Sequence, residues 1–433
     1  MAAIKEITVL VFPCGSEIGL ELHESLKDIR FIRLIGASSV KDHASFVYKN
    51  YIEGLPYLSD PTFDDAFRSL VEREHVDVVF PALDDAIVKL AELSDSLPCI
   101  VLGCERRTAD ICRDKEATYK LFADSWFNPQ TYRTIEAVSN YPVVIKPAVG
   151  QGSAGVKIVR SEEELSFELA NRKEKTVICE YLPGEEYTID CFTDRHGVLR
   201  YAAQRNRGRT KAGISVNSTL MEADETVHSI AEEINSKLSL RGMWFFQLKR
   251  NGAGEYRLLE VAPRVAGTMC LERAIGVNLP LLAIFDALDY DVDVLPQFSE
   301  CEVDRSLGNV FSVPCEYRTV YLDFDDTLVR DGQVVLKTVS FVYQCVNRGI
   351  PIVLLSRHER DIRESLRKAK LNESLFDQIV ILRDGEKKSD YIDVALDPIF
   401  IDDSFAERRD VSKVLGIKAF GLDNLEVLIS KKE

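Results

Sequence analysis

Two aspartates follow an apolar run near residue 320, in a spacing that suits phosphoryl chemistry. The segment VYLDFDDTLV (320–329) places Asp323 and Asp325 at the end of an expected strand, with Thr327 next. Because side chains two residues apart on a strand point to the same side, both carboxylates could reach one substrate. One could attack phosphorus while the other transfers protons. A strand that ends in an aspartate-rich turn without catalytic function has a similar sequence. This motif alone therefore leaves both a phosphoryl-transfer site and a structural turn open.

Three later segments supply a hydroxyl, a lysine and further carboxylates. IVLLSRH ends an apolar run at Ser356, RDGEKKSD carries Lys387 and Lys388, and IFIDDSFAER ends another run at Asp402 and Asp403. With the first motif, this set resembles the haloacid dehalogenase (HAD) superfamily of phosphatases. The similarity extends over about the last quarter of the chain.

That resemblance implies roles for individual residues. It implies that Asp323 is the nucleophile, which forms an aspartyl phosphate, and that Asp325 is the general acid/base. It implies that Ser356 binds the phosphoryl group and that a lysine neutralises it, for which we prefer Lys388 to the lysine before it. It also implies that Asp323, Asp325 and Asp402 are the metal ligands for Mg²⁺.

The spacing of these segments leaves little room for a cap domain. Only about 30 residues separate Asp325 from Ser356, and a similar number separate Ser356 from Lys388, whereas a separate domain typically needs about 50. We therefore predict a capless phosphatase with an open site.

A second kind of phosphate site is indicated near residue 150. The segment VVIKPAVGQGSAGV (143–156) carries Lys146 at the end of an expected strand, followed by Gly150, Gly152 and Gly155. Glycines let backbone N–H groups approach phosphate oxygens, and a lysine adds a positive charge. Taken alone, a glycine-rich hairpin with a surface lysine is an equally good interpretation.

Two further segments carry polar residues around expected turns. ICEYLPGEEYTID (178–190) holds Glu180 and Glu186 on either side of a Pro-Gly turn, which could offer backbone groups to adenine and a carboxylate to ribose. FFQLKRNGAGEYRLLEVAPR (245–264) is an expected hairpin with Gln247 and Glu260 on adjacent strands, and Arg264 follows. Such an oxygen pair suits Mg²⁺, which takes few protein ligands besides substrate phosphates.

In this order the segments resemble the ATP-grasp superfamily, most closely the branch of carbamoyl-phosphate synthetase and biotin carboxylase, over about residues 1–300. The Arg113-Asp114-Lys115 entry is part of the resemblance. It implies that Lys115 and Lys146 contact ATP phosphates and that the loop with Gly150, Gly152, Ser153 and Gly155 closes over them. It implies an adenine pocket at Glu180, Tyr181 and Leu182, ribose bound by Glu186, Mg²⁺ bound by Gln247 and Glu260, and Arg264 at the transferring phosphoryl group.

One position departs from the ATP-grasp pattern. The family usually has Asn two residues after the metal-binding Glu, and this chain has Ala262. The implied reaction is attack of a substrate carboxylate on ATP, giving an acyl phosphate that an amine or a thiol then displaces. A phosphotransferase that stops at a phosphorylated product and a nucleotide-sensing module remain as alternatives. The implied cofactors are ATP and Mg²⁺, with Mn²⁺ as an alternative, and the implied partners are small anionic or phosphorylated carboxylates and amines.

Weaker candidates for the substrate site lie elsewhere in the first half. The loop QRNRGRTKAGIS (204–215) concentrates four cations, which could be a solvated surface or a clamp for an anion. The turn at 13–17 and the pair Asp84-Asp85 follow expected strands, at the ends where α/β sheets bind ligands.

Elements that position these residues follow from periodicity. Short apolar runs alternating with helical patterns predict a parallel sheet at the start and again at the end of the chain, and alternating strands with glycine-rich turns predict an antiparallel sheet between them. The expected fold class is a multidomain chain of α/β and α+β parts. We expect a parallel-sheet pre-ATP-grasp domain at 1–113, an ATP-grasp fold at 114–300, a linker at 301–316 and a capless HAD-like doubly wound domain at 317–433.

Composition restricts the partners. The 433 residues carry a formal net charge of −16, which argues against nucleic acid and anionic membranes because both need clustered Lys and Arg. No signal peptide or membrane-spanning run is recognisable, and the 10 cysteines are scattered, so we expect a cytoplasmic protein with free thiols. A homodimer is compatible with these features.

Overall fold

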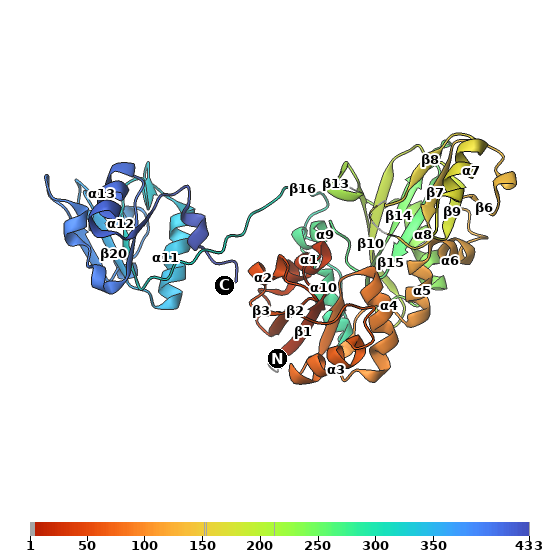
Figure 1. Ribbon diagram of the computed structural model, residues 1–433, viewed down its shortest axis with the longest axis horizontal. Helices are drawn as coiled ribbons and strands as arrows, with labels where there is room; N and C mark the ends of the chain where they lie inside the picture. The colour runs from red at the N-terminus through yellow and green to blue at the C-terminus, as the bar shows by residue number, and fades with distance from the viewer. Residues whose placement is uncertain (1–4, 151, 153, 212, 433) are drawn as a thin grey trace. The chain divides into compact units, whose positions relative to one another are not determined.

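The chain forms two compact units, residues 1–307 and 308–433. The computed structural model describes residues 5–150, 152, 154–211 and 213–432. Figure 1 shows the helices and strands of both units.

The first unit begins with a 5-stranded parallel sheet in the order β3-β2-β1-β4-β5. Strand β1 is buried along its whole length because its side chains enter two cores. Val9 and Val11 belong to one core, and Leu10 and Phe12 belong to the other. The elements are β1 (Ile7–Phe12), α1 (Glu17–Leu26), β2 (Ile32–Ala37), α2 (Ala44–Val47), β3 (Asn50–Ile52), α3 (Phe63–Arg73), β4 (Val78–Pro81), α4 (Asp84–Leu93), β5 (Ile100–Val101) and α5 (Arg106–Arg113).

Two antiparallel sheets make up most of the remainder of the first unit. The smaller has the order β6-β9-β7-β8, and the larger has the order β12-β13-β11-β10-β14-β15, with β16 paired to β13. The elements are α6 (Lys115–Leu121), β6 (Thr131–Tyr132), β7 (Val143–Pro147), β8 (Lys157–Val159), α7 (Glu162–Ala170), β9 (Thr176–Glu180), β10 (Glu186–Thr193), β11 (Leu199–Asn206), β12 (Arg209–Lys211), β13 (Ile214–Met221), α8 (Glu225–Lys237), β14 (Gly242–Arg250), β15 (Tyr256–Ala262), α9 (Cys270–Ala274), α10 (Leu279–Ala287) and β16 (Glu302–Asp304).

Helix α8 shows why the larger sheet is stable. Val227, Ile230 and Ile234 recur at helical spacing, so they form one apolar stripe. That stripe packs with Trp244 and Phe246 of β14, and all five side chains are fully buried. The opposite face of the sheet carries apolar residues of another core together with polar side chains.

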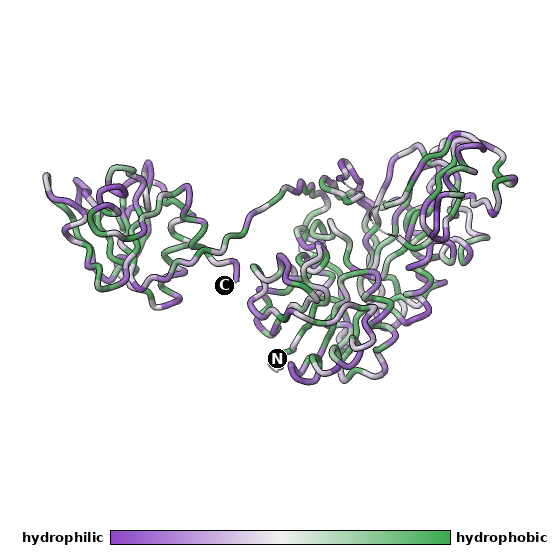
Figure 2. Tube along the Cα trace, viewed as in Figure 1, coloured by the Kyte–Doolittle hydropathy of each residue, from purple (hydrophilic) through white to green (hydrophobic). Residues whose placement is uncertain are grey.

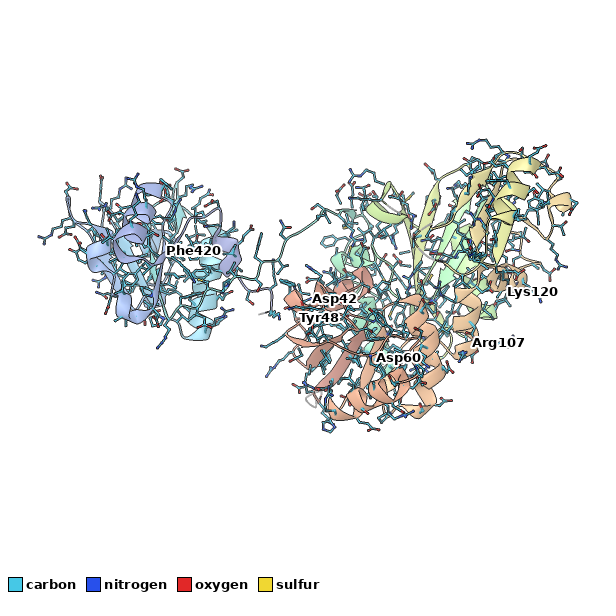
Figure 3. All side chains as sticks on the ribbon, in the orientation of Figure 1. Asp42, Tyr48, Asp60, Arg107, Lys120 and Phe420 are labelled. Atoms are coloured by element: carbon cyan, nitrogen blue, oxygen red, sulfur yellow. The ribbon has the colours of Figure 1, made fainter. Side chains whose placement is uncertain are left out.

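The beginning of helix α1 is packed tightly against the turn that follows β1. The Tyr48 hydroxyl donates to the Gly19 carbonyl at 2.6 Å, and the Ser38 hydroxyl donates to Asp42 at 2.5 Å; Tyr48 and Asp42 are labelled in Figure 3. A Cβ at Gly19 would meet the Cys14 carbonyl oxygen at 2.3 Å, so a side chain at this position would force the helix away.

The second unit is built on a 5-stranded parallel sheet in the order β21-β20-β17-β22-β23. Apolar stretches follow its strands in Figure 2, and cores lie on both sides of β17. The carboxyl ends of β20, β17 and β22 are neighbours, which brings the predicted phosphatase segments to one edge. The elements are β17 (Thr319–Leu322), β18 (Val329–Arg330), β19 (Gln333–Val334), α11 (Leu336–Arg348), β20 (Ile352–Ser356), α12 (Ile362–Lys368), β21 (Gln378–Ile381), β22 (Pro398–Ile401), α13 (Phe405–Leu415) and β23 (Lys418–Phe420).

The structure differs from the sequence prediction at the linker. Residues 302–304, which we placed in a linker beginning at 301, form β16 and pair with β13, and the boundary between the units falls after residue 307. Short runs such as β16 carry too few residues for a periodic signal. Among the described residues, no helix is long and apolar enough to cross a membrane.

Candidate active sites

A cavity of about 270 Å³ lies in the first unit beside the smaller and the larger antiparallel sheets. It is lined by most of the residues predicted to bind nucleotide and metal. These are Lys115, Lys146, Glu180, Tyr181, Leu182, Glu186, Gln247 and Glu260.

Lys146 is held inside this cavity by a residue that the sequence analysis missed. Its Nζ donates to the Tyr119 hydroxyl oxygen at 2.6 Å, and the Tyr119 hydroxyl donates to the Leu259 carbonyl at 2.8 Å. Burial raises the pKa of Tyr119 to about 12, so the hydroxyl stays protonated at neutral pH. Tyr119 lies four residues after Lys115 on α6, on the same face of the helix, and this spacing was the available signal.

Lys115 contacts the glycine-rich loop. Its Nζ donates to the Gly150 carbonyl at 3.1 Å. Burial lowers the pKa of Lys115, and the neighbouring Lys146 and Arg113 act in the same direction. Gly155 has φ +72°, and a Cβ there would meet Pro147 at 2.9 Å, so this position requires glycine. Ser153 lies outside the described residues.

Glu180 and Glu186 are both engaged in ion pairs. Glu180 accepts from the Gln130 backbone N–H at 2.9 Å and from Arg257 Nε at 3.3 Å. Glu186 Oε1 lies 2.8 Å from Arg207 Nε. The Glu186 carboxylate is thus near the cavity, where it neutralises a guanidinium.

Four polar residues form one row across the larger sheet. Thr188 is paired in register with Arg205 on one side and Gln247 on the other, and Gln247 is paired with Glu260. Directly opposed residues of antiparallel strands project from the same face. Thr188 is fully buried, and its hydroxyl has no hydrogen-bond partner among the described residues.

A second cavity, of about 290 Å³, is lined by all four residues of this row. It shares Arg207, Gly213, Gln247 and Glu260 with the first cavity, so the two spaces adjoin. Gly152, Arg264 and Glu17 of α1 also line it.

Arg264 is fixed by Asp84, which the sequence analysis singled out as a weak substrate candidate. The guanidinium donates twice to the Asp84 carboxylate, with one distance of 3.2 Å, and lies 5.1 Å from the centre of the Phe245 ring. Burial would raise the pKa of Asp84, but Arg264, helped by Arg113, holds it below the ordinary value. Asp85 accepts from Arg113 Nε at 2.7 Å. Both aspartates therefore hold arginines in place.

The cation-rich loop does not present four free charges. Arg205 is buried against Asp190, with Nε donating at 2.6 Å, and Arg209 pairs with Asp304 at 2.5 Å on the surface. Arg207 lines both cavities. Arg205 and Arg207 thus reach the cavities already paired with Asp190 and Glu186, whereas Arg209 belongs to the solvated surface, so the loop divides between the two interpretations that the sequence leaves open.

The second unit brings its predicted residues together around Lys388. Lys388 is buried and its Nζ donates to Asp323 Oδ1 and Asp402 Oδ2, both at 2.6 Å. Burial would lower the pKa of Lys388, but the two carboxylates raise it. Lys387 is 63% exposed and lies 3.9 Å from Asp410. Of the two lysines left open by the sequence, Lys388 is the one at the carboxylates.

Asp323, Asp402 and Asp403 place carboxylate oxygens within 4.8 Å of one another. Burial raises the pKa of Asp402 to about 6, with Asp323 adding to the rise and Lys388 opposing it. Burial likewise raises the pKa of Asp323. The Ser356 hydroxyl is buried and makes no hydrogen bond of standard geometry in the described part of the chain.

Asp325, which the resemblance implied as a metal ligand, is not a member of this carboxylate cluster in the described part of the chain. Both of its carboxylate oxygens are near His358 Nδ1, at 2.9 and 3.0 Å. His358 was not predicted from the sequence, and Asp403 was not predicted as a metal ligand. His358 stands two residues after Ser356, and that proximity was the one available signal.

Comparisons with known proteins bear on the first unit. The family model described as carbamoyl-phosphate synthase L chain, ATP binding domain, matches residues 119–184. The family model described as ATP-grasp in the biosynthetic pathway with Ter operon matches residues 172–306. Together they span less than half of the chain.

Three curated relatives are similar to parts of the chain. The vancomycin/teicoplanin A-type resistance protein VanA of Enterococcus faecium is 28% identical over 205 residues, which cover 40% of this chain and 59% of that protein. The arginine-specific large chain of carbamoyl phosphate synthase of Bacillus subtilis is 25% identical, covering 52% of this chain and 24% of the relative. A D-alanine–D-alanine ligase of Clostridium botulinum is 29% identical, covering 42% and 68%.

Solved structures share the fold. Biotin carboxylase of Campylobacter jejuni, solved as a β,γ-ATP complex, has a TM-score of 0.57 and 16% identity, covering 69% of this chain and 74% of that one. An L-amino acid ligase of Bacillus licheniformis has a TM-score of 0.54 and 19% identity, covering 68% and 76%. The chain thus contains a mixed α/β fold similar to that of ATP-grasp enzymes.

Proposed function

We propose that the first unit is an ATP-dependent ligase, which activates a carboxylate as an acyl phosphate and transfers it to an amine, or alternatively to a thiol. The observation that carries the proposal is the pair of adjoining cavities with Gln247 and Glu260 at their junction. One cavity suits the nucleotide, and the other suits the acid. Similarity to a D-alanine–D-alanine ligase and to an L-amino acid ligase supports this reaction class.

ATP fits the residues of the first cavity. The buried Lys146 and the partly buried Lys115 supply two cations for its phosphates. The glycine-rich loop, whose Gly150 carbonyl accepts from Lys115, would supply backbone N–H groups. Glu180, Tyr181 and Leu182 would border adenine. Glu186 would accept from ribose hydroxyls, which requires it to loosen its contact with Arg207.

Mg²⁺ fits the oxygen donors at the junction. Gln247 and Glu260 face each other on paired strands, and oxygen ligands are what this ion prefers. When bound there it would neutralise phosphate charge. Ala262 is buried and offers no donor, so this part of the site has one protein ligand fewer than the usual ATP-grasp pattern.

The second cavity would hold the carboxylate substrate. A carboxylate oxygen placed there attacks the γ-phosphorus of ATP, the bond to the bridging oxygen breaks, and ADP leaves. Arg264 and Arg207 lie where they can stabilise the negative charge of the transferred group. An amine then attacks the acyl carbon, loses a proton, and inorganic phosphate leaves.

We propose further that the second unit is a Mg²⁺-dependent phosphatase with Asp323 as nucleophile. Lys388 between two buried carboxylates supports this proposal. The pKa values of the Asp323 and Asp402 carboxyl groups are raised, so a cation bound beside them would favour their ionised forms. Asp323, Asp402 and Asp403 offer the oxygen donors that Mg²⁺ prefers. When bound, the ion would neutralise phosphoryl charge. The buried Ser356 hydroxyl, which makes no hydrogen bond of standard geometry among the described residues, would donate to a phosphoryl oxygen.

Product analysis tests the ligase proposal. Purified full-length protein is incubated with ATP, Mg²⁺ and pools of the 20 amino acids and small dicarboxylic acids, and ADP release is followed by mass spectrometry of the products. A condensed product with ADP and phosphate is expected. A stable phosphorylated acid would identify a phosphotransferase, and nucleotide binding without turnover in any pool would identify a sensor.

A further inference from the structure

His358 makes the closest described contact to Asp325, the proposed proton-transferring residue of the phosphatase site. Its Nδ1 lies 2.9 and 3.0 Å from the two carboxylate oxygens. The histidine side chain is 10% exposed, whereas that of Asp325 is 53% exposed. In the part of the chain that the structure describes, no other side chain hydrogen-bonds this carboxylate.

The histidine ring is itself fixed on two further sides. Its Nε2 lies 2.7 Å from the Ser365 hydroxyl oxygen on α12. Its ring packs edge-on against Phe324, with centroids 4.9 Å apart and an interplanar angle of 71°. If Nδ1 carries the proton, it donates to Asp325 while Nε2 accepts from Ser365, and both ring nitrogens have a hydrogen-bond partner.

Asp325 needs such a support because its surroundings are open. It is followed by Asp326 with φ +59° and by a two-residue strand, so the backbone leaves a sheet and enters a tight turn. A half-exposed carboxylate on such a turn has several rotamers available in water. A ring that is only 10% exposed and is anchored on two sides restricts that choice to the rotamers that reach Nδ1.

We propose that His358 is a positioning residue of the phosphatase site, which orients the Asp325 carboxyl group for proton transfer. The inference rests on the proposed phosphatase function. His358 touches neither the phosphoryl group nor the nucleophile in this scheme and acts through Asp325.

The two chemical steps show what this orientation provides. In the first, Asp323 Oδ forms a bond to phosphorus, the bond to the ester oxygen breaks, and Asp325 gives its proton to the leaving oxygen. In the second, water attacks the aspartyl phosphate and transfers a proton to Asp325, the bond from Asp323 to phosphorus breaks, and phosphate leaves. The rate of the first step depends more strongly on Asp325 when the leaving oxygen is more basic.

Two phosphate esters distinguish a role of His358 in orienting Asp325 from a general role in the stability of the fold. The p-nitrophenolate ion departs without a proton, whereas the alkoxide of β-glycerol phosphate needs one. The value of kcat/KM reports the first step. The ratio of kcat/KM for the two esters is independent of how much of a variant is folded.

The experiment compares full-length variants in Mg²⁺ on both esters. His358→Ala is expected to lose about tenfold to a hundredfold on β-glycerol phosphate and less than about threefold on p-nitrophenyl phosphate. His358→Asn, whose amide can replace Nδ1–H, should recover most of the loss. Ser365→Ala should shift the ratio in the same direction by a smaller factor. Glu359→Gln, an exposed neighbour, should leave the ratio unchanged.

Other outcomes would overturn the inference. Equal losses on both esters would assign His358 to the fold alone, and a gain on β-glycerol phosphate would show that it holds Asp325 away from the substrate. A His358→Asn variant no better than alanine would exclude the hydrogen bond. If the wild type hydrolyses neither ester, the phosphatase assignment fails and the inference fails with it.

Discussion

Replacing Lys388 by methionine should destabilise the second unit far more than the same change at Lys387. Lys388 is 4% exposed and bonds two buried carboxylates, so Lys388→Met leaves both without their cation. Breaking a buried ion pair in this way costs about 3–5 kcal/mol, against a typical total of about 5–15 kcal/mol for a domain. Lys387 is 63% exposed with its partner at 3.9 Å, where such pairs contribute at most about 1 kcal/mol.

The pH dependence of this loss follows from the carboxylates. Burial already raises the pKa of Asp402 to about 6, and removal of the lysine raises it further. A carboxyl group whose folded pKa exceeds its unfolded pKa costs no stability at low pH and destabilises as the pH rises through the folded value. The difference in the free energy of unfolding between Lys388→Met and wild type should therefore be small near pH 4 and grow up to pH 7 and above.

The assay has to resolve the two units. Trp126 and Trp244 both lie in the first unit, so tryptophan fluorescence reports that unit only. Differential scanning calorimetry of the full chain, compared at pH 4.5 and 7.5, follows the second unit as well. Equal shifts for the two lysine variants, or a Lys388→Met loss that is independent of pH, would show that the ion pairs of Lys388 with Asp323 and Asp402 do not stabilise the second unit.

Three further changes test the first unit. Tyr119→Phe removes the oxygen that receives the Lys146 hydrogen bond, and titration calorimetry should show ADP affinity reduced about fivefold to thirtyfold. Thr188→Val removes a buried hydroxyl at similar shape, so steady-state kinetics should show about a tenfold higher KM for the acid at unchanged nucleotide affinity, and Thr188→Ser should restore it. Burial, with Asp190 adding, raises the pKa of Glu272 to about 8. The free energy of unfolding of the wild type should therefore fall as the pH rises from about 4.5 through 8. In Glu272→Gln this pH-dependent loss should be absent when denaturant midpoints at pH 6 and 9 are compared.

Sequence reasoning was most successful where a long apolar run determined an element. The strand expected to end at Asp323 and Asp325 appears as Thr319–Leu322, and the hairpin expected over 245–264 appears as Gly242–Arg250 paired with Tyr256–Ala262. Short strands such as β12 and β16 were not predicted, because 3 residues are too few to show a periodic pattern. These strands form through pairing with a neighbouring strand.

Candidate residues were recognisable where a motif is local in sequence. The pairing of Gln247 with Glu260 followed from the hairpin, and the structure has it in register. Contacts across long separations could not be predicted. Arg264 with Asp84, and Arg209 with Asp304, are joined by folding alone, so charges that appeared free in the sequence are neutralised.

We propose that the chain carries two separate phosphoryl-handling sites, one built around Lys146 and one around Asp323. The most direct measurement determines ATP-dependent ADP formation and phosphoester hydrolysis side by side in wild type, Lys146→Ala and Asp323→Asn. Lys146→Ala should weaken ATP binding about tenfold to a hundredfold and leave ester hydrolysis intact. Asp323→Asn should abolish ester hydrolysis and leave ADP formation intact. Unchanged ATP binding in the first variant, or wild-type hydrolysis in the second, would contradict the account.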